Sequence, residues 1–116
     1  MKPHFDSIFY YVSDLDRGVR FYRDVLGFKL CSRDAVARFD VDGVLFEIVP
    51  SDETLTVPQK GNARFCLQVE NVEEALRELR AKGVTTGQPE VKSNGVLGSF
   101  FDPDGNELCL WQYVDP

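Results

Sequence analysis

The sequence predicts an α+β fold in which two βαβββ modules form a curved mixed sheet around a cavity, with the helices on the outer face. Two observations support this prediction. Strand-like and helix-like segments follow the same order in both halves of the chain, so the second half repeats the pattern of the first. In addition, the best-defined strands have one apolar face and one face that mixes aromatic and polar residues, which is typical of a sheet lining a ligand site.

The first half of the chain contains a strand, a helix and three further strands. Residues 5–12 are rich in aromatic and β-branched residues and predict a strand. A helix is expected to begin at Ser13 and Asp14 and to end before Gly27. Strands are then expected at 28–32, 35–41 and 44–49, the last two joined by a tight turn at Asp42-Gly43.

The second half repeats this order after a polar connector. Residues 63–69 predict a strand, and Asn71 with Glu74 forms a capping box that opens a helix ending at Gly83. Strands are expected near 85–91 and 96–101, followed by a turn at 102–106 and a last strand at 107–114. We therefore expect one domain, 1–116, with a first module at about 1–50, a connector at 51–62 and a second module at about 63–116.

Composition excludes several classes of protein. The 13 basic and 19 acidic residues give a net charge of −6 without a basic stripe, which argues against a nucleic-acid partner. No apolar run approaches the ~20 residues of a membrane span, and the N-terminus lacks the apolar segment of a signal peptide. The three widely spaced cysteines do not form a disulfide framework or a zinc knuckle, and we expect Cys31 to be a small buried residue. The protein is predicted to be cytoplasmic.

The mixed faces of four strands supply the candidate ligand-binding residues. The opposite faces, which carry residues such as Val12, Phe46 and Leu108, are almost wholly apolar and are expected to pack under the helices. The candidate ligand-binding residues are Ser7, Phe9, Tyr11, Glu47, Arg64, Cys66, Gln68, Cys109 and Trp111. Glu107 has the same parity but is expected at the rim beside the turn, and the facing of Arg38 and Phe39 is left open. The alternative is an ordinary, half-solvated sheet surface.

Two stretches of the sequence resemble a known family. Val12-Ser13-Asp14-Leu15, followed by 21–28 (FYRDVLGF), is similar to the first-module signature of the vicinal oxygen chelate superfamily, and 101–106 (FDPDGN) is similar to its second-module signature. That superfamily includes glyoxalase I, extradiol dioxygenases, fosfomycin-resistance enzymes and bleomycin-resistance proteins. The resemblance covers nearly the whole chain and is specific for the fold rather than for the reaction.

The resemblance also implies where a metal centre would be. Metal-dependent members typically use a His on the first strand and a Glu on the fourth strand of each module. The internal repeat places Ser7 and Arg64 at the two His positions and Glu47 and Cys109 at the two Glu positions, so that only Glu47 matches. A conventional metal centre is therefore not expected, because a catalytic metal usually needs three protein ligands and Arg64 would repel a cation. No cofactor is expected, although a divalent metal is not excluded.

Two functions follow from the resemblance. The leading hypothesis is a metal-independent protein that binds an amphiphilic or aromatic small molecule in the sheet cavity, as the antibiotic-sequestering members do. The alternative is a lyase, isomerase or dioxygenase-type enzyme of the same superfamily with a degenerate metal site, for which Glu47, Arg64 and Cys109 are the candidate catalytic residues. A salt bridge between Glu47 and Arg64 is an equally acceptable structural interpretation of that pair. The resemblance further implies a homodimer.

Overall fold

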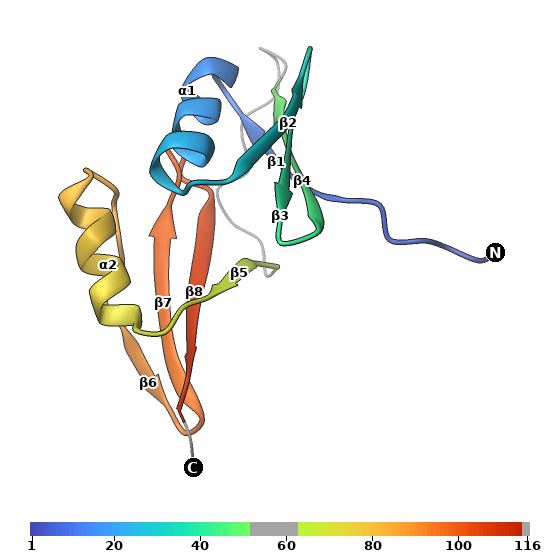
Figure 1. The fold of residues 1–116 in the computed structure, drawn as a ribbon. Coiled ribbons are helices and arrows are strands. Elements are labelled where there is room, and N and C mark those ends of the chain that lie inside the picture. The colour runs from blue at the N-terminus through green and yellow to red at the C-terminus, as the bar shows by residue number, and fades with distance from the viewer. Residues whose placement is uncertain (52–62, 115–116) are drawn as a thin grey trace. The chain divides into compact units, whose positions relative to one another are not determined.

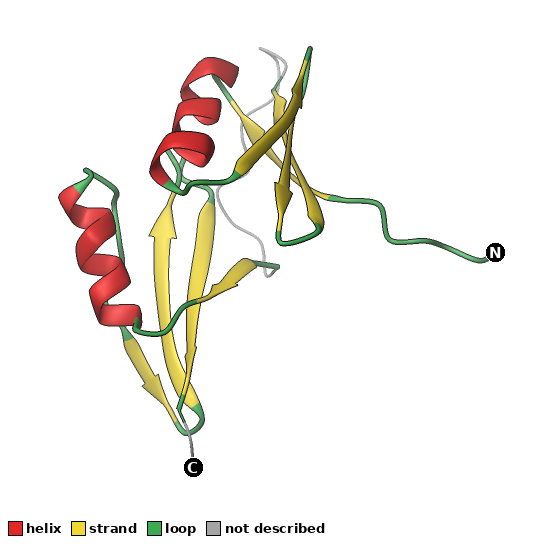
Figure 2. Ribbon diagram, in the orientation of Figure 1, coloured by secondary structure: helices red, strands yellow, loops and turns green. Residues whose placement is uncertain are grey.

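The computed structural model describes residues 1–51 and 63–114, so nearly all of the predicted connector lies outside the described residues. The chain divides into two compact units, Met1–Pro58 and Gln59–Pro116. Each unit contains a four-stranded mixed sheet and a helical segment in βαβββ order (Figures 1 and 2). The predicted α+β fold of two βαβββ modules is confirmed.

The first unit contains four strands in the order β1-β4-β3-β2. The elements are β1 (Ile8–Val12), α1 (Leu15–Val19), a π-helical continuation η1 (Arg20–Val25), β2 (Lys29–Arg33), β3 (Ala37–Val41) and β4 (Val44–Pro50). β1 pairs with β4 in parallel, whereas the other pairs are antiparallel. The first strand begins at Ile8 rather than at residue 5, and Phe5 before it is 76% exposed.

The helical segment of this unit begins where the sequence predicts. The carboxylate of Asp14 accepts a hydrogen bond of 3.0 Å from the backbone N–H of Arg17, so Asp14 is the N-cap. A regular α-helix does not continue to Gly27, because the chain changes to the wider π form from Arg20. Within this π-helical segment the consecutive residues Phe21 and Tyr22 are both buried.

Aromatic side chains form the core between the helical segment and the sheet of the first unit. Tyr22 packs against Phe28, Phe39 and Phe46 with ring centroids 4.9 to 6.1 Å apart. Phe39 is completely buried, which settles the facing that its sequence pattern left open. A Cβ atom on Gly18 would lie 2.8 Å from Ile48 Cδ1, so glycine permits the close approach of α1 to β4.

The second unit contains four strands in the order β5-β8-β7-β6. Its elements are β5 (Phe65–Gln68), α2 (Val72–Ala81), β6 (Glu90–Lys92), β7 (Gly95–Phe101) and β8 (Glu107–Tyr113). β5 and β8 are parallel and the other pairs are antiparallel. The strand expected at 85–91 is reduced to three residues, because Gly87 and Pro89 interrupt it and Thr86 forms only an isolated bridge to Phe100.

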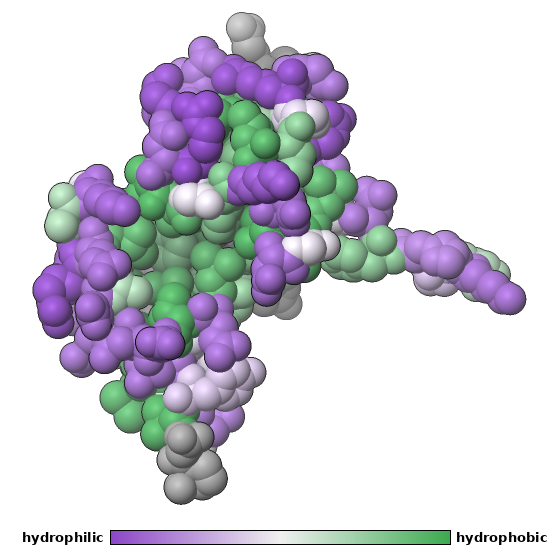
Figure 3. Space-filling model, in the orientation of Figure 1, coloured by the Kyte–Doolittle hydropathy of each residue, from purple (hydrophilic) through white to green (hydrophobic). Residues whose placement is uncertain are grey.

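Helix α2 packs on one face of the second sheet. The side chain of Asn71 accepts a hydrogen bond of 2.9 Å from the backbone of Glu74, which confirms the predicted N-terminus. Val72 and Leu76 are fully buried, and Gly98 of β7 lets them approach, since a Cβ there would lie 2.7 Å from Val72 Cγ1. The remaining surface of α2 is hydrophilic, as Figure 3 shows over this helix.

The strand registers reproduce the internal repeat. Phe9 of β1 is paired with Glu47 of β4, and Cys66 of β5 is paired with Cys109 of β8. These pairs are separated by the same shifts of 57 and 62 residues that the sequence pattern indicates. The repeat is therefore a repeat of structure as well as of pattern, and equivalent positions in the two units can be compared directly.

Two further findings bear on the composition. Cys31 is exposed on the edge strand β2, so the expectation that it is buried is wrong; the edge position leaves its side chain uncovered. Within residues 1–51 and 63–114, no helix has the length and apolar character needed to cross a membrane.

Candidate functional site

The face of the first sheet opposite its helix carries a row of four side chains. Phe9 on β1 and Arg38 on β3 are both directly paired with Glu47 on β4, and Ser32 on β2 is paired with Arg38. Paired residues on neighbouring strands point to the same face of a sheet. The structure therefore brings the predicted residues Phe9 and Glu47 together and adds Arg38, which sequence reasoning left unplaced because its strand has mixed character on both sides.

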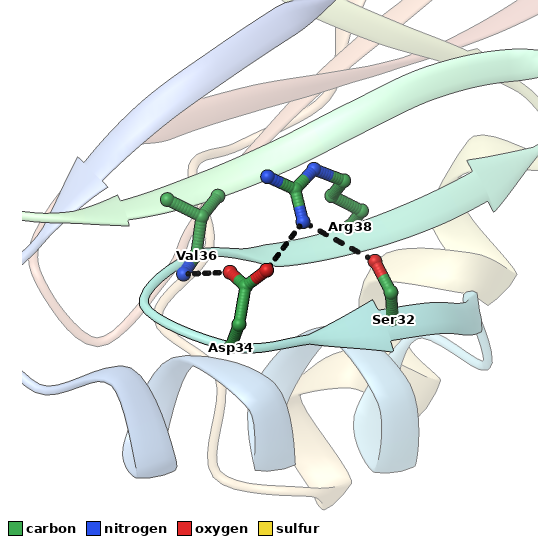
Figure 4. Close-up of polar contacts among 4 residues, drawn as sticks. All are labelled: Ser32, Asp34, Val36 and Arg38. Carbon is green, nitrogen blue, oxygen red and sulfur yellow. Dashed lines mark hydrogen bonds and ion pairs between the residues drawn. The ribbon is translucent and has the colours of Figure 1, made fainter.

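The guanidinium of Arg38 is anchored at the tip of the β2–β3 hairpin. Its Nη1 atom lies 3.3 Å from Ser32 Oγ and 3.3 Å from Asp34 Oδ2 (Figure 4). The other carboxylate oxygen of Asp34 accepts a 3.0 Å hydrogen bond from the backbone N–H of Val36. These contacts, first the Val36 N–H and then Arg38, lower the pKa of Asp34. The hairpin tip thus holds the Arg38 guanidinium on this face in an ion pair with Asp34.

Aromatic side chains extend along the same faces in both units. Phe9 is 49% exposed and meets Tyr11 edge to face with ring centroids 5.5 Å apart. In the second unit, Trp111 and Tyr113 form a similar pair at 5.8 Å. The Trp111 indole lies over Gly95 of β7, where a Cβ atom would overlap the ring. Trp111 is therefore partly covered by its own sheet, and Phe9 offers the more accessible ring.

The second unit has a polar cluster formed by Arg64, Ser99 and Glu107. Its Nε atom lies 3.2 Å from Glu107 Oε2, and the hydroxyl of Ser99 donates a 3.1 Å hydrogen bond to the same oxygen. The side chains of Arg64 and Glu107 are 33% and 27% exposed, so the pair is only partly solvated. Sequence reasoning considered Glu47 as the partner of Arg64 and put Glu107 at the rim. The equal parity of Glu107 and Cys109 was the signal that could have identified this role.

Two cysteines lie beside this cluster. Cys66 and Cys109 are directly paired on β5 and β8, and Ser99 on β7 is paired with Cys109 on its other side. Burial raises the pKa of both thiols, and the Glu107 carboxylate raises that of Cys109 further, although Arg64 and Ser99 act in the opposite direction. A nucleophilic cysteine requires a lowered pKa. The environment of Cys109 therefore disfavours the nucleophilic role considered from the sequence.

The two other predicted ligand-binding residues lie at the ends of their strands. Ser7 is half-buried immediately before β1, and Gln68 is exposed at the end of β5, where it is paired with Trp111. The nine predicted residues thus lie on the strand faces opposite the helices or at strand ends of their own units, and Cys109 is buried there. Whether the two open faces enclose one cavity stays a prediction.

The residues at the superfamily's metal-ligand positions do not form a suitable donor set. Ser7 and Arg64 replace imidazoles, and Arg64 carries a fixed charge that is paired with Glu107. Cys109 is buried with a raised pKa, which leaves Glu47 as the one matching ligand. Among the described residues, no group of three or more His, Cys, Asp or Glu side chains is arranged to hold a metal ion. The donors present do not fit a three-ligand divalent metal site.

Comparison with known proteins identifies the family. The sequence profile of the Glyoxalase/Bleomycin resistance protein/Dioxygenase superfamily matches residues 4–110. The chain belongs to this superfamily. The resemblance inferred from the two signature stretches is therefore confirmed.

Curated relatives in the superfamily include enzymes. The glutathione transferase FosA of Serratia marcescens is 32% identical over 104 residues, which cover 85% of this chain and 73% of FosA. A lactoylglutathione lyase of Oryza sativa is 28% identical over 123 residues and 90% of this chain. The chain spans 42% of the length of that plant enzyme.

Solved structures share the fold at low sequence identity. The fosfomycin resistance protein FosX of Listeria monocytogenes, solved with Mn(II) and sulfate, has a TM-score of 0.79 at 19% identity. The match covers 98% of this chain and 93% of the FosX chain. TnmS3, an antibiotic binding protein from Streptomyces, has a TM-score of 0.73 at 24% identity. The match covers 98% of this chain and 100% of the TnmS3 chain. Proteins of this fold therefore include one solved with a metal ion and one described as antibiotic binding.

Proposed function

We propose that this chain is a metal-independent binding protein that holds an amphiphilic, aromatic small molecule against the open faces of its sheets. The observation that carries the proposal is the exposure of Phe9. This ring is 49% exposed although it lies within strand β1, and Tyr11 lies edge-on beside it. A stacked aromatic ligand would gain ~0.5–1.5 kcal/mol on such a ring beyond the apolar area that it buries.

The charges beside Phe9 give the ligand its polar contacts. Glu47 is directly paired with Phe9 and would accept a hydrogen bond from a cationic or hydroxyl group. Arg38 and Arg64 would bind an anionic group, Arg38 in competition with Asp34 and Arg64 in competition with Glu107. The net charge of −6 favours the approach of cationic compounds. TnmS3, an antibiotic binding protein of the same fold, supports sequestration of an antibiotic as the biological role.

A planar aromatic cation tests this proposal. Proflavine would be titrated into the protein by calorimetry and followed in parallel by the fluorescence of Trp111, the one tryptophan of the chain. We expect a single saturable site, weakened about tenfold by Phe9→Ala, which corresponds to ~1.4 kcal/mol. Phe5→Ala is the matched control, because Phe5 is 76% exposed but lies before β1. Equal effects of the two substitutions would overturn the proposal, as would the absence of saturable binding by proflavine.

An enzyme is the second candidate, and Glu47 is the observation that favours it. It has the residue type that metal-dependent members place at this position, and FosA and lactoylglutathione lyases are enzymes of the superfamily. In this alternative, Glu47 acts as a general base with Arg64 as an electrostatic clamp, or a degenerate metal site uses Glu47 and Cys109.

Metal titration distinguishes the two candidates. The purified protein would be analysed for bound metal and titrated with Ni(II), Zn(II), Mn(II) and Fe(II) by calorimetry. Stoichiometric binding that Glu47→Ala abolishes would favour the enzyme over the binding protein. Binding of none of the four ions would leave the binding protein as the better candidate.

We further propose that the protein is a cytoplasmic homodimer. The sequence resemblance supports the dimer, and exposed apolar side chains on β6 and β8 supply surface for it: Val91 is 84% exposed and Tyr113 is 66% exposed. Sedimentation velocity at micromolar concentration would give the mass. A monomeric mass would contradict the dimer, and Val91→Lys would locate the interface if it dissociates the dimer.

A further inference from the structure

Two thiols lie side by side on the open face of the second sheet. Cys66 of β5 and Cys109 of β8 are directly paired in parallel register. Neighbouring strands are about 4.8 Å apart, and directly paired residues point to the same face. The Cys66 thiol also acts electrostatically on the pKa of Cys109, as expected of two adjacent sulfur atoms. Cys66 is exposed and Cys109 is buried, so solvent reaches the pair from the Cys66 side.

We propose that Cys66 and Cys109 together form a bis-thiolate site for a soft, low-coordinate cation of the Cu(I) type. Thiolate sulfur is the protein ligand that such cations prefer. When the cation binds, each sulfur forms a metal–sulfur bond and releases its proton to solvent, and the oxidation state of the metal does not change. This site goes beyond the ligand binding proposed above and does not depend on it.

The surroundings of the two thiols suit a two-ligand site. Cys109 has Cys66 on one side and Ser99 on the other, so the third neighbour is a hydroxyl rather than a further thiol or imidazole. In the described residues no third His, Cys, Asp or Glu completes a cluster able to hold a metal. Zn(II) takes four ligands in structural sites, so two thiolates leave its coordination incomplete, whereas two sulfur ligands are enough for Cu(I).

The electrostatic environment makes binding depend on pH. Burial and the Glu107 carboxylate favour the protonated form of Cys109, whereas Arg64 and Ser99 favour the thiolate. On Cys66, burial alone raises the pKa. Protons therefore compete with the cation at both sulfurs, and the affinity for Cu(I) rises with pH.

The site differs from the metal positions that the superfamily resemblance implies. Cys109 occupies one of those four positions, but Cys66 is equivalent to Phe9 of the first unit, which is not one of them. The two proposals fail separately, since proflavine binding depends on Phe9 in the first unit and Cu(I) binding depends on two cysteines in the second.

The experiment is an anaerobic titration of the reduced protein with Cu(I) in competition with bicinchoninate. We expect one Cu(I) per chain and a thiolate-to-copper charge-transfer band in the ultraviolet. Cys66→Ser and Cys109→Ser should each weaken binding by roughly 100-fold, because one thiolate cannot replace two. Cys31→Ser is the matched control, as Cys31 is exposed on β2 of the other unit, and it should leave the affinity unchanged.

Three results would overturn the site. They are full affinity in either single variant, loss of affinity in Cys31→Ser, and Zn(II) binding as tight as Cu(I) binding. Circular dichroism confirms that each variant is folded. If Cys109→Ser does not fold, because it places a hydroxyl at a buried position, Cys109→Ala provides the same test.

Discussion

The ion pair between Arg64 and Glu107 allows a quantitative prediction about the second unit. The two groups are 3.2 Å apart with side chains 33% and 27% exposed, so their coupling should lie at the upper end of that for surface pairs, about 0.5–1 kcal/mol. Glu107→Ala also removes the acceptor of the Ser99 hydroxyl, which contributes a further ~0.5–1.5 kcal/mol. We therefore expect Glu107→Ala to lower the free energy of unfolding by about 1–2.5 kcal/mol, or roughly 4–10 °C in Tm.

A double-mutant cycle measures the coupling itself. Urea unfolding of Arg64→Ala, Glu107→Ala and the double variant would give the interaction free energy of the pair. The control is the same cycle on Lys92 and Glu90, whose groups are 3.5 Å apart with side chains 50% and 62% exposed, and there we expect less than about 0.3 kcal/mol. A coupling between Arg64 and Glu107 no larger than this control would refute the reasoning, and Arg64 would then be available to a ligand without displacing Glu107.

Two other predictions follow from the same structure. Gly95→Ala should displace the Trp111 indole that covers this glycine, destabilising the protein by about 1–3 kcal/mol and shifting the tryptophan fluorescence; an unchanged emission spectrum would contradict the packing. Because folding raises the pKa of Cys66 and Cys109, the unfolded chain loses these protons first, so the stabilisation is complete below pH ~8.5 and is lost as pH rises through the folded pKa values. The free energy of unfolding, measured with urea, should therefore fall more between pH 7.5 and 9.5 for the native protein than for the Cys66→Ser, Cys109→Ser double variant. An equal fall in the two proteins would contradict the raised thiol pKa values.

The sequence by itself determined the order of elements, the repeat and the buried faces of the strands. These features arise from local patterns: capping residues at Asp14 and Asn71, the turn at Asp42-Gly43, and the strict alternation of side chains along each strand. The same alternation assigned Phe9, Glu47, Arg64 and Cys109 to the faces opposite the helices, because parity along a strand needs no knowledge of its neighbours.

The tertiary structure decided which of these side chains meet. The register between strands fixes the pairing of Arg38 with Glu47 and of Cys66 with Cys109, and it makes Glu107 a partner of Arg64. The predicted turn at Asp42-Gly43 already implies the pairing of Arg38 with Glu47, because loop length fixes the register of a hairpin. The Cys66–Cys109 and Arg64–Glu107 pairs join residues that are distant in the chain, so no local pattern contains that information. Register depends on the fit of the whole sheet against its helix, and that fit exists only once the chain has folded.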